Sequence, residues 1–280
     1  MHNPATHAAH QPPVFDDSPM IGRLTAWWRG RQASQIDIPA ETWAEVESGL
    51  WFLDHLGTQE RADLRQLARE FIAAKEWTGA QGLQLTPRIQ LAIALQACLP
   101  ILHLGLDWYS GWVGIIVYPG DFIIPRQVMD EGGVVHEFDD QVMGEAWHGG
   151  PVLVSWFDDP EDSRGVNVVI HEFAHKMDMK NGDADGMPPL HDGMSRKRWA
   201  EVMGTAFEDF RRRVDSGEDT LIDPYAAELP SEFFAVTSEV FFEDPLLLRD
   251  DYPEVYEQLS LFYRQDPGLG YRYAHGRDQT

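Results

Sequence analysis

Residues 166–178 read VNVVIHEFAHKMD, an apolar run followed by a His-Glu-x-x-His motif. In an α-helix of about 3.6 residues per turn, His171 and His175 lie one above the other on the same face, close enough to bind one metal ion. Glu172 is turned away from that pair by roughly a quarter of a turn, where it can reach a water molecule at the metal rather than the metal itself. This arrangement predicts a zinc hydrolase.

The third metal ligand has to come from elsewhere, because a catalytic zinc site needs three protein ligands and one open position. The class whose third ligand is a histidine shortly after the motif would need a glycine at Asp178 and a histidine at Asn181, and it is excluded. His191 lies in a loop between Pro189 and Gly193, where a solvated surface role is the ordinary outcome. A carboxylate from a later helix is therefore the better candidate.

That later helix is expected to begin at Pro230, since proline suits the first helical position, and to end near Glu243. Glu232 lies in its first turn and Glu239 lies two turns further on the same face, so either could reach the metal by spacing alone. Apolar neighbours leave little room for solvent around this strip, so both carboxylates are expected to be buried and partnered. These neighbours are Phe233, Phe234, Val236, Val240, Phe241 and Phe242.

The remainder of the chain predicts an α+β fold that is mainly helical. Apolar residues spaced by three and four indicate helices, which are expected over 41–53, 58–75, 86–99, 194–214 and 256–263. Short β-rich runs separated by glycine and proline indicate a small sheet beside the motif helix, with strands over 113–118, 121–124, 134–138 and 152–156. The motif helix itself is expected from a cap at Ser163 to a stop at Asn181-Gly182.

The composition of the chain indicates one domain with an extension at each end. Residues 1–19, rich in Pro, His and Asp, are expected to be a disordered extension, and 271–280 a flexible tail. Residues 20–270 are expected to form one domain, in which a helical part, 20–107, precedes the sheet and catalytic helices of 108–270. Its first segment, 20–31, predicts a short amphipathic basic helix packed on the body.

Charge and hydropathy exclude several classes of protein. The formal net charge of −24 argues against nucleic acid as a direct ligand, because binding phosphates takes clustered Lys and Arg. Cys98 is the only cysteine, which permits no intramolecular disulfide and fits a reducing compartment. The N-terminal region has no apolar core typical of a signal peptide, and polar residues interrupt the most apolar region, 89–123, so no transmembrane segment is expected. These features indicate a cytoplasmic protein.

Several motifs together resemble a known family. They are the His-Glu-x-x-His helix through Asp178, Asn181-Gly182-Asp183, Tyr225-Ala226-Ala227, and Glu232-Phe233-Phe234-Ala235-Val236 with Ser238-Glu239. This combination resembles the Mlc titration factor A family of bacterial zinc metallopeptidases, over about residues 20–267.

The resemblance implies a zincin-like fold similar to the catalytic domain of anthrax lethal factor. It implies that His171, His175 and Glu232 are the zinc ligands. It also implies that Glu172 is the general base that takes a proton from the attacking water.

Further roles follow from the same resemblance. Tyr225 would hydrogen-bond the oxyanion of the tetrahedral intermediate, while Glu239 and Asp178 would orient or neutralise the site from behind the ligands. The family also implies aminopeptidase-like activity on peptide substrates and binding of a transcriptional repressor similar to Mlc. The alternative is a non-catalytic interaction protein that sequesters a transcriptional regulator around a structural or regulatory metal. Glu172 speaks against that alternative, because a purely structural site needs no base.

Two other parts of the sequence contain residues that can bind a metal ion. Residues 181–192 partly match a calcium-binding EF-hand loop, but Asn181 and Asp192 stand at its two ends in place of the preferred residues, and Pro188-Pro189 would stiffen it. A polar turn beside the active-site cleft is expected instead. His136, in a predicted strand, is expected to be an ordinary structural residue.

Overall fold

The computed structural model describes residues 33, 36–129, 135–157 and 166–270, without the side chains of 124–141. The expected disordered extension 1–19, the helix over 20–31 and the tail 271–280 therefore lie outside the described residues. So do Ser163, the expected cap of the motif helix, and the side chain of His136.

The first part of the described chain is helical, as the sequence predicts. It contains α2 (Ala40–Gly49), the short 3-10 helix η1 (Trp51–His55), α3 (Thr58–Ala74) and α4 (Pro87–Cys98). Thr86 begins α4, because its hydroxyl accepts a hydrogen bond from the N–H of Ile89 (3.3 Å). Apolar residues on nearly every side of α4 are buried, so this helix runs through the core and packs on α2, α3 and α5.

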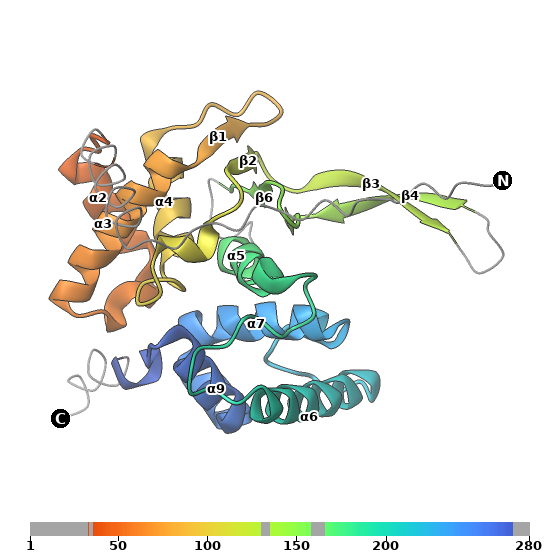
Figure 1. The fold of residues 1–280 in the computed structure, drawn as a ribbon. Coiled ribbons are helices and arrows are strands. Elements are labelled where there is room, and N and C mark those ends of the chain that lie inside the picture. The colour runs from red at the N-terminus through yellow and green to blue at the C-terminus, as the bar shows by residue number, and fades with distance from the viewer. Residues whose placement is uncertain (1–32, 34–35, 130–134, 158–165, 271–280) are drawn as a thin grey trace, which may run out of the picture.

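The strands form two sheets instead of the single small sheet expected. The main sheet has the order β1-β2-β6-β5, in which β1 (Glu76–Gly79), β2 (Gly114–Tyr118) and β6 (Val152–Ser155) are parallel. The edge strand β5 (Gly144–Ala146) runs antiparallel to β6. A separate antiparallel pair, β3 (Phe122–Met129) and β4 (Val135–Val142), extends away from the body (Figure 1).

The motif helix, α5 (Val168–Asp178), lies between the sheet and the C-terminal helices (Figure 1). It is capped by Asn167, whose side-chain oxygen accepts from the N–H of Ile170 (3.0 Å). The expected start at Ser163 is thus wrong, because Asn167 already satisfies the first turn. The end agrees with expectation: a 3-10 turn, η4 (Met179–Asn181), follows, and Gly182 ends it with φ 152°.

The C-terminal part consists of α6 (Arg196–Asp215), the 3-10 turn η5 (Pro224–Ala227), α7 (Pro230–Glu243), α8 (Pro245–Asp251) and α9 (Pro253–Tyr263). Proline opens each of the last three helices, where its missing N–H costs nothing. The helix α7 lies alongside α5 (Figure 1), with which it makes extensive contact. This pairing places the motif against the helix that bears Glu232.

One cluster of buried side chains connects these elements, from Trp43 in α2 to Tyr263 in α9. Both helices belong to it, α5 through five apolar residues that include Phe173 and α7 through four phenylalanines among others, so their relative position is fixed by packing on both helices. Within the described part of the chain, no helix is long and apolar enough to cross a membrane.

Candidate metal centre

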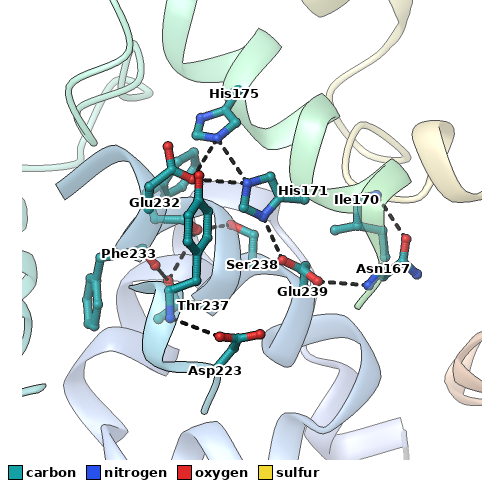
Figure 2. A network of polar contacts seen from close by, with 12 residues as sticks. Asn167, Ile170, His171, His175, Asp223, Glu232, Phe233, Thr237, Ser238 and Glu239 are labelled. Atoms are coloured by element: carbon teal, nitrogen blue, oxygen red, sulfur yellow. Dashed lines mark hydrogen bonds and ion pairs between the residues drawn. The ribbon is translucent and has the colours of Figure 1, made fainter. Parts of the chain in front are cut away.

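Three ligand atoms converge between α5 and α7 (Figure 2). The Nε2 atoms of His171 and His175 are 3.1 Å apart, and Oε2 of Glu232 lies 3.1 Å from the first and 3.2 Å from the second. Among the described residues, no other group of three His, Cys, Asp or Glu side chains brings its ligand atoms within such a short span, 4.8 Å. The structure therefore joins the two motif histidines to Glu232, 57 residues beyond His175.

The chemistry of these atoms fits a cation. Glu239 lies behind His171, and its Oε1 accepts a hydrogen bond from Nδ1 of that imidazole (2.7 Å). With its proton on Nδ1, a neutral His171 presents the lone pair of Nε2 to the centre. Two imidazole nitrogens and a carboxylate oxygen are the ligand set typical of a catalytic zinc site.

The pKa shifts of Glu232 and His171 also indicate that these side chains can bind a cation. Burial alone would raise the pKa of Glu232, but hydrogen bonds from His171 and His175 lower it to about 2. Burial alone would lower the pKa of His171, but Glu232 and Glu239 raise it well above its usual 6.5. The carboxylates of Glu232 and Glu239 thus place negative charge beside the imidazoles, where it favours a proton or a metal ion, and metal binding would displace the proton.

Asn167 supports the centre from the start of α5 (Figure 2). Its backbone N–H donates to Oε2 of Glu239 (2.8 Å), and its side-chain Nδ2 donates to Oε1 of Glu243 (2.7 Å). One residue therefore caps α5 and holds two carboxylates of α7. Asn167 was not among the residues predicted from the sequence, although an asparagine directly before an apolar run is an N-cap signal.

Glu172 lies beside the three ligands without belonging to them. It is 5% exposed, and its Oε2 has no hydrogen-bond partner within the described residues. Burial raises its pKa to about 7, although the two nearby imidazoles act to lower it. The edge strand β5 packs directly on it, because a methyl group added at Gly144 would lie 2.5 Å from its Oε1.

Tyr225, in the turn η5, lies beside His171. Its backbone N–H donates to Oδ1 of Asp223 (2.9 Å), which holds the start of the turn η5. Its ring centre is 6.0 Å from that of His171, and the residue remains 45% exposed. Tyr225 is thus a half-exposed residue beside a metal ligand, at the wall of a cavity.

Asp178 and His191 bind backbone groups. Oδ2 of Asp178 accepts from the N–H of Gly186 (2.7 Å), which ties the loop after η4 to the end of α5. Burial raises the pKa of Asp178 to about 6. Nε2 of His191 donates to the carbonyl of Phe262 (2.7 Å), so His191 is a partly buried structural residue, and the expectation of a solvated surface histidine is wrong. The 181–192 loop binds its own backbone, with Asn181 Nδ2 donating to the carbonyl of Met187 (3.0 Å).

A cavity of about 990 Å³ opens beside the centre. His171, Glu172 and Glu239 line it, with β5 at one wall and η5 at another. Tyr225 and Val240 also line it, so the cavity extends from the turn η5 along α7. It is large enough to hold several residues of a peptide.

Comparison with known proteins gives consistent matches. Residues 24–264 match the family described as glucose-regulated metallo-peptidase M90. The Klebsiella pneumoniae protein named Mlc titration factor A is 40% identical over 222 residues, which cover 77% of this chain and 83% of that protein. Proteins with the same name from Escherichia fergusonii and Salmonella paratyphi B are 35% identical over 260 residues and 37% identical over 248 residues. These alignments cover 90% and 86% of this chain, and 96% and 91% of the two relatives.

Proposed function

Because the chain belongs to the glucose-regulated metallo-peptidase M90 family, which includes the Mlc titration factor A proteins, we propose that it is a zinc-dependent metallopeptidase. Its reaction is the hydrolysis of peptide bonds, with aminopeptidase-like activity. The observation that supports this most strongly is the position of Glu172, a buried carboxyl with one free oxygen, beside three converging ligand atoms at the wall of one cavity.

His171, His175 and Glu232 would hold the zinc ion. When bound, zinc would lower the pKa of a water molecule to about 7 and polarise the substrate carbonyl. Glu239 holds His171 in the tautomer that presents Nε2 to the ion. We infer that the fold around these residues is zincin-like.

Glu172 takes a proton from the attacking water and later gives it to the leaving amine. A group that must accept and then donate a proton works best with a pKa near the working pH, and burial raises that of Glu172 to about 7. Its free Oε2 is the atom that receives the proton.

Tyr225 and Asp178 have supporting roles in this proposal. The phenol of Tyr225 donates a hydrogen bond to the oxyanion that develops on the substrate carbonyl, where such donors contribute most. Asp178 lies one turn after His175 and within electrostatic range of it. Its charge would partly neutralise the positive charge at the centre.

The setting of this activity is also a proposal. We infer that residues 20–270 form one domain, because one buried cluster runs from Trp43 to Tyr263. The relatives' name supports a second role, binding of a transcriptional repressor similar to Mlc, and such a role would place the protein in the cytoplasm. A protein that only sequesters the regulator remains the alternative, and the free oxygen of Glu172 favours the peptidase.

Removal and return of the metal test the proposed function. Purified protein should contain about one zinc ion per chain and hydrolyse peptides, lose this activity with a chelator and regain it with zinc. Glu232→Gln should bind zinc much more weakly, while Glu208→Gln, on α6, should behave as the parent. A chain that binds no zinc, or that hydrolyses peptides equally well without it, contradicts the proposal.

A further inference from the structure

The cavity beside Glu172 continues along one face of α7. Val236, Val240 and Glu243 follow Glu232 at helical spacing and line up on that face, and Asp244 comes directly after the helix. A helix rises about 1.5 Å per residue, so Glu243 lies roughly 16 Å along the axis from Glu232. From the metal ligand outward, the wall presents Val236 and Val240 and then the carboxyls of Glu243 and Asp244; Glu239 lies between the two valines, with its oxygens bound to His171 and Asn167.

The whole cavity is strongly acidic. Besides Glu172 and Glu239, its lining includes five further carboxyl side chains, those of Asp121, Asp223, Glu228, Glu243 and Asp244. The lining residues that the structure describes include no lysine and no arginine. Low-dielectric walls with charge of one sign attract ligands of the opposite sign and repel those of the same sign.

Glu243 is a largely buried carboxyl that a positive partner would stabilise. Burial raises its pKa to about 7; the hydrogen bond from Asn167 acts to lower it, and the charge of Glu239 acts to raise it. A cation beside this carboxyl would stabilise its ionised form. Asp244 adds a second carboxyl at the same end, where its Oδ1 accepts from the N–H of Leu247 (3.2 Å).

We propose that this end of the cavity binds the basic side chain of a lysine or arginine residue in the peptide substrate. The aliphatic stem lies along Val236 and Val240, and the charged head lies between Glu243 and Asp244. Lysine and arginine side chains combine an apolar stem with a charged end, the same order that the wall presents. An acidic side chain is repelled there, and an apolar one leaves Glu243 without its partner.

This inference rests on the proposed function for its substrate, so the test separates the two. A quenched fluorescent peptide of alanines carries a single lysine, moved one position at a time along the chain. Matched peptides carry norleucine, which has the same stem without the charge. The lysine peptide is expected to have a kcat/KM about tenfold higher at one position near the cleaved bond.

The double variant Glu243→Gln/Asp244→Asn is expected to abolish this preference without unfolding the chain. Glutamine keeps the oxygen that accepts from Asn167, and asparagine remains a good N-cap for α8. Glu208→Gln, with its carboxyl on an exposed part of α6 outside the cavity, is the charge-matched control and should keep the preference. Equal rates for lysine and norleucine peptides at every position, or a preference that survives in the double variant, would overturn the inference.

Peptide binding tests the basic-side-chain site independently of hydrolysis. Calorimetry with Glu172→Gln should show the lysine peptide binding about tenfold more tightly than its norleucine match. A chain that hydrolyses neither peptide contradicts the proposed peptidase, yet selective binding of the lysine peptide would still support the basic-side-chain site. Equal binding of the two peptides, or binding of neither, would overturn it.

Discussion

Glu239 and His171, separated by 68 residues in the chain, lie 2.7 Å apart through Oε1 and Nδ1. The other oxygen of Glu239 accepts the backbone N–H of Asn167 (2.8 Å). Both oxygens of this carboxylate therefore accept a hydrogen bond, one to orient a metal ligand and the other to fix the start of α5. The metal centre depends on this contact between two helices as well as on its three ligands.

Glu239→Gln is expected to weaken zinc binding by about 10- to 100-fold, the usual cost of losing a partner behind a metal-binding histidine. Glutamine has one oxygen where glutamate has two, so one of the two N–H groups loses its acceptor. Competition with a chromophoric chelator measures the affinity. Glu243→Gln, one turn further along α7, should leave it unchanged; equal affinities for Glu239→Gln and the parent would contradict this role.

Gly144→Ala is expected to lower kcat about 100-fold, because small misplacements of a catalytic group are costly. The added methyl group would lie 2.5 Å from Oε1 of Glu172 and 2.6 Å from its Cγ, so the carboxyl must move. Zinc content should not change, since Glu172 is not a ligand. Gly204→Ala in α6 is the matched control, because its methyl group meets nothing within 4 Å. A Gly144→Ala enzyme as fast as the parent would show that Glu172 tolerates displacement.

Lys75 gives a prediction about stability and pH. Its ammonium donates to the carbonyls of Tyr109 (2.7 Å) and Trp112 (2.8 Å) and lies 3.4 Å from the centre of the Trp112 ring. Burial lowers its pKa from 10.5 to about 7, and the charge of Lys176 adds to this effect. At a pH between the unfolded pKa of 10.5 and the folded pKa of about 7, Lys75 binds a proton in the unfolded chain but has released it in the folded chain. The free energy of unfolding therefore rises with pH in this window.

The comparison with Lys75→Met isolates this contribution. Urea unfolding at several pH values between about 7 and 10 should show the parent gaining stability relative to the variant as pH rises. Near pH 10, where the folded chain no longer holds this buried charge, Lys75→Met should be less stable than the parent, because two buried carbonyls lose their donor. A difference in stability that stays constant with pH, or that shrinks as pH rises, would contradict the lowered pKa.

The sequence predicted the parts of the fold that have strong periodic signals. The helices α3, α4, α6 and α7 have apolar residues at helical spacing, and their expected bounds agree closely with the structure. The strands β1 and β5 were missed because they are short. The strand β5 is three residues long and reads Gly-Glu-Ala, which has no β-forming side chain, and β1 has four residues. The helix α8 follows α7 after one residue and was missed for the same reason, its shortness.

The metal centre likewise has one part that the sequence predicted and one part that it left open. The spacing of His171 and His175 follows from helical geometry and is visible in the sequence. Spacing alone left the third ligand open between Glu232 and Glu239, because both lie on one face of α7. Only the pairing of α5 with α7 separates them: Glu232 faces both Nε2 atoms, while Glu239 faces Nδ1 of His171.

The most direct test of the central claim is peptide hydrolysis by zinc-loaded Glu172→Gln. Glutamine has nearly the same shape but cannot accept the proton, so the account predicts a kcat at least about 100-fold below that of the parent, with one zinc ion still bound. A variant that keeps its zinc and hydrolyses peptides at the parent's rate would contradict the assignment of Glu172 as the general base.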